Sequence, residues 1–185
     1  MQVAGAVLTG GASTRMGRAK MLVDVDGRPM ARRVCDALAS GGCNPIAMIG
    51  GSATELESLE LPVVEDLYPG DGPLGGTITA LRHFESAPHV LVAACDLALL
   101  DAATVRAMLA AAGSAPGAAA VVAHTDRNEP GLVLWNQTAL EVLTSAFTAG
   151  MRAVHRALTL VGTTTLLVDA AVMLNVNRPD DVPGK

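Results

Sequence analysis

The sequence has few aromatic residues and a small excess of negative charge. Two Phe, one Trp and one Tyr are its aromatic side chains, although 50% of its 185 residues are hydrophobic, so the core has to be aliphatic. Proteins that hold single-stranded nucleic acids stack the bases on aromatic side chains, which are scarce here. The net charge of -5 argues against a protein that covers phosphate backbones, because that role requires a basic surface. We therefore expect no nucleic-acid partner.

Long hydrophobic runs and closely spaced cysteines are also missing. No segment approaches the roughly 18 uninterrupted apolar residues of a membrane span, and the apolar run of about six residues in the opening "MQVAGAVL" is too short for a signal peptide. Cys35, Cys43 and Cys95 lie far apart without C-x-x-C spacing, which is typical of reduced intracellular thiols. We expect a soluble, cytoplasmic protein with no membrane partner, and 185 residues suit a single domain, 1–185.

Apolar segments of strand length alternate with segments of helical periodicity. Helices are expected to begin near Pro29, Pro73 and Asp101, the last as an N-cap, and to cover 140–147 and 151–158. Strands that are apolar throughout and alternate with helices are typical of parallel βαβ units with both faces covered. The sequence therefore predicts a three-layer α/β fold, a mostly parallel twisted sheet with helices on both faces. The expected strands are residues 3–8, 45–50, 61–66, 89–96, 117–124, 131–135 and 164–169.

The first expected strand runs into "LTGGASTRMGRAK", residues 8–20, which combines glycines, hydroxyls and positive charges. A loop of this composition after a buried strand indicates an anion site. It is not a P-loop, because Arg18 follows Gly17 where G-x-x-x-x-G-K-[ST] requires lysine. It is not the dinucleotide fingerprint G-x-G-x-x-G either, because Ala12 stands where the second glycine belongs.

Polar residues follow three of the expected strands. In an open parallel sheet, ligands bind outside the carboxyl ends of the strands. There the loop 8–20 would lie beside Glu65 and Asp66, which end the third strand, and Asp96, which ends the fourth. A cationic loop next to carboxylates predicts a site for a nucleoside triphosphate bridged by a divalent metal.

The pattern in the loop, G-G-x-S-x-R-M-G-x-x-K, resembles the signature of the nucleotidyltransferases that activate sugars, alditols and pterins. It is most similar to the molybdenum cofactor guanylyltransferase family. Four further segments resemble motifs of that family and follow in its order: "VVEDLYPGDGPLGG", "AACD", "RNEP" and "LNVNRPDD". The matches extend from residue 8 to residue 181 and imply a Rossmann-like nucleotidyltransferase fold.

The resemblance implies how GTP is bound. The base would be held mostly by the backbone at residues 8–11, where glycine lets the chain approach the nucleotide without a Cβ in the way. Arg15 and Lys20 would bind the triphosphate and act in catalysis, because both can neutralise charge on the α-phosphoryl oxygens and the departing pyrophosphate. The residues implied in binding the nucleotide and its metal are Leu8, Thr9, Gly10, Gly11, Ser13, Lys20, Asp66, Asp96, Asn175 and Asn177.

The resemblance also implies a metal and an acceptor. Asp96 matches the family's magnesium ligand and is the third catalytic candidate. Mg²⁺ takes a carboxylate, phosphate oxygens and waters, so one aspartate can suffice. Asp66 matches an aspartate that contacts the nucleotide. Asn175 and Asn177 would either lie near the acceptor or complete the shell of the metal.

The implied reaction is transfer of GMP from GTP to a phosphorylated acceptor, molybdopterin, with release of pyrophosphate. Transient contact with molybdoenzymes or with other proteins of cofactor biosynthesis is implied as well. Two alternatives stay open: a relative that uses CTP or another phosphorylated acceptor, and a nucleotide-binding module that has lost turnover. The pair Gly10 and Gly11 favours GTP, because cytidylyl members of the superfamily tend to have A-G there.

Four positions depart from the family pattern and keep the alternatives open. Ala19 replaces an aspartate before the lysine, and Gly50 replaces a polar nucleotide contact. Ala98 replaces the proline of C-D-x-P, and Glu129 replaces a histidine and adds negative charge where the acceptor is expected. The charged residues within 152–156 are interpreted as solvated helix surface.

Overall fold

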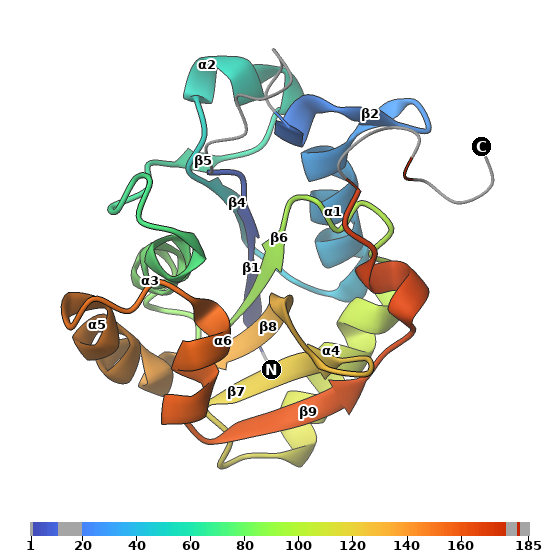
Figure 1. The fold of residues 1–185 in the computed structure, drawn as a ribbon. Helices are drawn as coiled ribbons and strands as arrows, with labels where there is room; N and C mark the ends of the chain where they lie inside the picture. The colour runs from blue at the N-terminus through green and yellow to red at the C-terminus, as the bar shows by residue number, and fades with distance from the viewer. Residues whose placement is uncertain (1, 11–19, 177–180, 182–185) are drawn as a thin grey trace.

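The computed structural model of the protein describes residues 2–10, 20–176 and 181. Most of its strands join one sheet, which runs through the middle of the molecule (Figure 1). A small hairpin apart from it pairs β2 (Asp24–Val25) with β3 (Arg28–Pro29). Among the described residues the larger sheet has seven strands, in the spatial order β5 (Val63–Val64), β4 (Ile46–Ile49), β1 (Val3–Leu8), β6 (His89–Ala94), β8 (Asn128–Asn136), β7 (Ala120–His124) and β9 (Thr163–Leu167).

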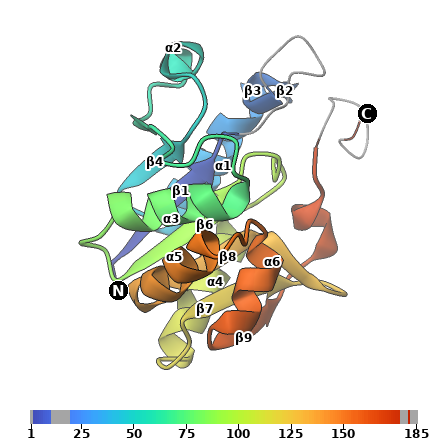
Figure 2. The same cartoon turned by 60° about the vertical axis from the view of Figure 1, so that its left-hand side comes forward.

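Helices cover both faces of the larger sheet. Figure 1 shows α3 (Pro73–His83), α5 (Leu140–Thr148) and α6 (Val154–Ala157) on the left, and α1 (Met30–Gly41) and α4 (Ala102–Ser114) on the right; the first three come to the front in Figure 2. The side chains of β1 alternate between the two layers. Val3 and Val7 belong to the core beneath α1 and α4, and Ala4 and Ala6 to the core beneath α3 and α5. The predicted three-layer fold is confirmed.

The sheet is parallel except around β8, which pairs antiparallel with both β6 and β7. The prediction that all strands belong to parallel βαβ units is therefore wrong for β8. The reason is the length of the connection: β7 ends at His124 and β8 begins at Asn128. Parallel neighbours need a crossover of about a dozen residues or more, whereas a short turn joins antiparallel ones. The segment "RNEP", expected between strands, lies largely within β8.

The remaining elements are short. They are α2 (Ala53–Leu56), η2 (Lys20–Leu22), η3 (Glu57–Leu59), η4 (Gln137–Ala139), η5 (Leu158–Leu160) and η6 (Ala170–Met173). The helix expected over 151–158 begins only at Val154 and passes into η5, so it is shorter than predicted. No helix in the described ranges has both the length and the apolar character needed to cross a membrane.

Two smaller expectations are also confirmed. Asp101 is the N-cap of α4: its Oδ1 accepts the Thr104 backbone N–H at 2.7 Å, which lowers the pKa of the carboxyl. None of the three cysteines forms a disulfide. Burial raises the pKa of Cys35 and Cys43 to about 12, so these two thiols stay protonated in the core.

Helices α1 and α4 approach each other closely at Gly41, the last residue of α1. A Cβ there would overlap the side chain of Val105 in α4. Gly113, near the end of α4, is exposed, and nothing lies within 4 Å of the position that a Cβ would take there. The two glycines lie in the same pair of helices but differ in the space around them.

We predict that Gly41→Ala lowers the free energy of unfolding by about 1 to 3 kcal/mol, because the added methyl forces the two helices apart. Gly113→Ala should leave the protein unchanged or stabilise it by up to about 1 kcal/mol, since alanine favours a helix where space allows. Urea denaturation of both variants measures the difference. Equal stability of the two variants would show that the helices do not depend on this close approach.

Candidate functional site

The carboxyl ends of β1, β4, β5 and β6 lie side by side. β1 is central: Leu8 is in register with Ile49 of β4 and with Ala94 of β6, and Ile49 is in register with Val64 of β5. The pairing of β1 with β6 continues one residue further, because the Cys95 N–H donates to the Leu8 carbonyl at 3.3 Å. The residues that follow these strands are therefore neighbours, as the sequence predicts.

The start of the loop after β1 is fastened to the end of β4. The backbone N–H groups of Thr9 and Gly10 donate to the Ile49 carbonyl at 2.9 and 3.2 Å. The buried Thr9 hydroxyl donates to the Gly50 carbonyl at 2.7 Å. These bonds leave Gly10 exposed at the edge of the sheet.

Gly50 lies against this turn with little space for a side chain. Its φ is +75°, and a Cβ would come within 3.1 Å of the Gly10 Cα and 3.2 Å of the Gly10 nitrogen. A larger residue would strain the backbone and press on Gly10. The departure from the family pattern at position 50 thus has a local structural reason, which is the contact between the ends of β1 and β4.

Asp66 follows β5 and joins it to helix α3. Its Oδ1 accepts the Tyr68 N–H at 3.0 Å and the Thr79 hydroxyl at 2.8 Å. Thr79 is buried in α3, and its hydroxyl oxygen also accepts the Leu67 N–H at 3.1 Å. The other carboxylate oxygen, Oδ2, lies 3.8 Å from the position of a Cβ on Gly10. Asp66 thus holds its own turn with one oxygen and faces Gly10 with the other.

Helix α3 begins close to Leu8. A Cβ on Gly76 would lie 3.1 Å from Leu8 Cδ2, and one on Gly75 would lie 2.9 Å from Tyr68 Cβ. The paired glycines of "GPLGG" therefore let the first turn of the helix reach the end of β1. The N-terminus of a helix carries partial positive charge and favours nearby anions.

Arg152 holds the segment that leads into α3, a role that the sequence does not reveal. Its carbonyl accepts the Leu74 N–H at 3.3 Å, and its Nε lies 3.4 Å from Asp71 Oδ1. The guanidinium also lies 4.1 Å from the centroid of the Phe147 ring and donates to the Phe147 carbonyl at 2.8 Å. Arg152 is exposed, as the sequence predicts, but it is also structural, because Asp71 and Leu74 belong to a segment distant in sequence.

Asp96 lies in the turn after β6 and is partly buried. Its carbonyl accepts the Val176 N–H at 2.9 Å, which attaches the end of the described chain to this turn. Val176 is fully buried, and the preceding Asn175 is exposed. The described part of this motif, residues 174–176, is therefore anchored beside Asp96 by Val176, and Asn175 lies next to that anchor.

The first half of β8 lies close to Ala94 and Leu97, which precede and follow Asp96 in the chain. A Cβ on Gly131 would be 3.6 Å from Ala94 Cβ and 3.7 Å from Leu97 Cδ1. In the same part of β8, Glu129 Oε1 accepts the Thr125 hydroxyl at 2.8 Å and lies 3.4 Å from Arg127 Nε. The negative charge of Glu129 is therefore paired, and an anionic acceptor would meet a partly neutralised group.

The structure places Leu8, Thr9, Gly10, Asp66 and Asp96 at the same edge of the sheet, with Gly10 next to Asp66. Asn175 adjoins Asp96 through its neighbour Val176. Five positions lie outside the described residues: the predicted site residues Gly11, Ser13, Arg15 and Asn177, and Ala19, which departs from the family pattern. For Lys20 the backbone is described, and it begins η2.

A single carboxylate at Asp96 suits a cation that takes its other ligands from the substrate and from water. In the described part of the chain, no three His, Cys, Asp or Glu side chains gather into a metal site. A divalent cation at Asp96 would therefore draw most of its ligands from phosphate oxygens and water. Mg²⁺ is bound in this manner, by one or two carboxylates together with substrate phosphates.

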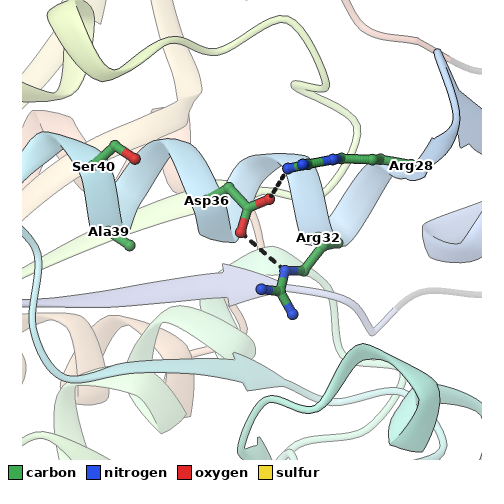
Figure 3. Close-up of a pocket in the computed structure, with 5 residues that line it drawn as sticks. All are labelled: Arg28, Arg32, Asp36, Ala39 and Ser40. Atoms are coloured by element: carbon green, nitrogen blue, oxygen red, sulfur yellow. Dashed lines mark hydrogen bonds and ion pairs between the residues drawn. The ribbon is translucent and has the colours of Figure 1, made fainter.

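A separate hollow of about 420 Å³ lies on the outer face of α1 (Figure 3). Asp36 ion-pairs there with Arg28 Nη1 and Arg32 Nε, both at 2.9 Å. Arg32 Nη1 also donates to the Leu59 carbonyl at 2.8 Å, which ties η3 to α1. The positive charges are used within the protein, so this hollow is a structural feature and not the candidate site.

A mostly parallel α/β sheet with a glycine-rich turn and carboxylates at the strand ends is the architecture of a nucleotide-binding enzyme. The family profile described as "MobA-like NTP transferase domain" matches residues 5–163. The chain therefore belongs to the MobA-like NTP transferase family, whose members are nucleotidyltransferases.

Individual relatives agree with this assignment. The chain is 28% identical over 181 residues to a molybdenum cofactor guanylyltransferase of Xanthomonas euvesicatoria pv. vesicatoria, covering 95% of this chain and 90% of the relative. It is 30% identical over 154 residues to a protein of that name from Shewanella sp. (strain ANA-3), covering 82% and 78%. The crystal structure of molybdopterin-guanine dinucleotide biosynthesis protein A from Archaeoglobus fulgidus superimposes with a TM-score of 0.75 at 25% identity, covering 98% of this chain and 95% of that one. The resemblance inferred from the motifs is confirmed.

Thr79→Val tests how the turn at Asp66 is held. The variant removes the hydroxyl that serves both Asp66 and the Leu67 N–H, so we predict a loss of about 1 to 3 kcal/mol in unfolding free energy and faster amide exchange at Leu67 and Tyr68. Thr77→Val is the matched control, because the Thr77 hydroxyl, equally buried in α3, donates only to the Pro73 carbonyl in the bonds described. Unchanged exchange at Leu67 in Thr79→Val would refute the role of Thr79.

Proposed function

We propose that the protein transfers GMP from GTP to molybdopterin, with release of pyrophosphate. The observation that supports this proposal is that the Gly10 turn, Asp66 and Asp96 follow neighbouring strands at one edge of the sheet. The relatives add the chemistry, since two of those described above are named molybdenum cofactor guanylyltransferases. The nucleotide would lie along this edge, with its base at β1, β4 and β5 and its phosphates toward β6.

The base end of the site is built from backbone. Exposed Gly10 and the constrained Gly50 offer main-chain groups at a place where no Cβ intervenes, which suits recognition of a flat base edge. Asp66 Oδ2 faces the same place and can accept hydrogen bonds from N–H or O–H groups of the nucleoside. Since Oδ1 is already held by Tyr68 and Thr79, the carboxylate is oriented before the nucleotide arrives.

The phosphate end relies on charge. We propose that Arg15 and Lys20 bind the triphosphate, Arg15 through its planar fork and Lys20 as a compact point charge. The N-terminus of α3, which lies close to Leu8, adds partial positive charge to the same edge. Asp96 would hold Mg²⁺, and the ion would supply further neutralisation of the triphosphate and the leaving pyrophosphate.

The chemical step requires little from side chains beyond positioning. A terminal phosphate of the acceptor attacks the α-phosphorus of GTP, the bond to the β-phosphate breaks in line, and pyrophosphate leaves. The attacking phosphate is already ionised at neutral pH, so no general base is needed. Catalysis then consists of holding the two phosphates in line and stabilising the charge that develops on the α-phosphoryl oxygens.

The acceptor would approach from the β8 side of Asp96. Val176 is anchored to the Asp96 turn, and we propose that Asn175 and Asn177 contribute to binding the acceptor or to the metal shell. The paired charge of Glu129 reduces the repulsion that its sequence position suggests. We also propose a cytoplasmic location and transient contact with proteins that deliver or receive the cofactor.

The alternatives have less support. The names of the relatives do not favour a CTP-dependent enzyme. The binding-module alternative depends on the departures at positions 19, 98 and 129. Of these, Glu129 is paired with Arg127 and Thr125, which reduces its effect on an anionic acceptor.

The test is pyrophosphate release with Mg²⁺, molybdopterin and each of the four NTPs. We predict release with GTP, little with the other three, and none without the acceptor. Asp96→Asn should reduce the rate by roughly 10²-fold or more, because it removes charge stabilisation at the reacting phosphates.

Asp101→Asn is the matched control for the charge change. It removes a carboxylate from the same stretch of chain but keeps a side chain that can cap α4, so its rate should stay near that of the wild type. GTP binding without pyrophosphate release, with molybdopterin or other phosphorylated acceptors, would sink the enzyme proposal. Full activity of Asp96→Asn would show that the metal lies elsewhere.

A further inference from the structure

The turn that carries Asp96 is held by backbone hydrogen bonds within it and by contacts from other segments. Within it, the Leu97 N–H donates to the Ala94 carbonyl at 3.3 Å and the Leu100 N–H to the Leu97 carbonyl at 2.9 Å. Ala98 follows Asp96 by two positions, and an alanine leaves φ free where a proline would fix it near -65°. Contacts from outside the turn, such as the bond from the Val176 N–H to the Asp96 carbonyl, add to these bonds in holding Asp96.

Arg33 of α1 supplies such contacts. Its Nε donates to the Ala98 carbonyl at 2.9 Å, and its Nη1 donates to the Val25 carbonyl at 3.2 Å. Nη1 also lies 3.9 Å from Asp26 Oδ2 in the β2–β3 hairpin. The Arg33 guanidinium thus links the turn after β6 to the β2–β3 hairpin, which lies more than sixty positions earlier in the sequence. The Arg33 side chain is 27% exposed.

The same segments meet in a small hydrophobic cluster. Its buried members are Val23, Val25, Met30, Ala98 and Val176. The cluster joins the hairpin, the start of α1, the turn and the "LNVN" anchor. Since Val176 also donates its N–H to the Asp96 carbonyl, the turn is fixed on one side by Val176 and on the other by Arg33.

We propose that Arg33 is a positioning residue, which holds the Asp96 turn in place for the reaction. The planar fork of an arginine reaches two carbonyls in a fixed geometry and loses little freedom in doing so, which a lysine does not reproduce. Ala98 and Val25 are both buried, so their carbonyls would be costly to leave without this donor. The structural part of this inference, that Arg33 holds the turn, does not depend on the proposed function. The expected effect on turnover does rest on the proposed function.

The first measurement concerns the turn itself and needs no substrate. Arg33→Met should speed backbone amide exchange at Leu97 and Leu100 by about tenfold, the effect of losing roughly one hydrogen bond from the closed state. Arg32→Met is the matched control on the same helix. It removes one carbonyl bond, to Leu59, and one ion pair, with Asp36, whereas Arg33→Met removes two carbonyl bonds and one ion pair. Neither Leu59 nor Asp36 belongs to the turn of Asp96.

The second measurement concerns catalysis. In Arg33→Met we expect kcat to fall about tenfold, because a small displacement of a catalytic group is enough for such a loss, while KM for GTP changes less than about twofold. The concentration of Mg²⁺ required for half-maximal rate should rise. Arg33→Lys should recover part of kcat, and Arg32→Met should keep the wild-type values of all three quantities.

The outcomes separate this inference from the proposed function. Wild-type exchange at Leu97 and Leu100 in Arg33→Met would overturn the inference, and so would faster exchange with unchanged kcat and Mg²⁺ requirement. A wild-type protein without turnover on any NTP would instead contradict the proposed function. In that case the exchange of Arg33→Met against Arg32→Met still decides whether Arg33 holds the turn.

Discussion

The parallel pairing of β1 with β4 on one side and β6 on the other is the constraint on which the candidate site depends. Because Leu8 is in register with both Ile49 and Ala94, three strands end at the same level. The turns that follow these strands therefore lie at the same edge of the sheet. A one-residue slip of β1 would exchange its two buried faces, so the apolar cores on both sides also maintain the geometry of the site.

Close backbone packing takes the place of large side chains around this edge. Gly10 lies against Gly50, and Gly76 lies against Leu8, in each case with a distance that a larger residue would disturb. In the proposed site, a chain with very few aromatic residues would bind a nucleotide in this way, with main chain at the base and charge at the phosphates. The polar side chains then have orienting partners, as Asp66 has in Thr79.

Much of the fold could be predicted because the strands β1, β4 and β6 are almost entirely apolar and polar residues follow them. The position of Asp66 and Asp96 at one edge follows from that pattern and from the rule for parallel sheets. The antiparallel direction of β8 was missed, although the expected strands 117–124 and 131–135 are only six residues apart, too few for a parallel crossover. The roles of Thr79, Arg152 and Arg33 were also hidden, because each contacts segments that are distant in sequence.

A crystal structure of the protein with GTP and Mg²⁺ is the most direct measurement of where the nucleotide binds. We predict that the guanine lies at Leu8, Thr9 and Gly10 beside Asp66, that Arg15 and Lys20 contact the triphosphate, and that the metal bridges Asp96 and phosphate oxygens. A nucleotide bound with its triphosphate away from Asp96, or at another face of the protein, would contradict the assignment of this edge as the active site.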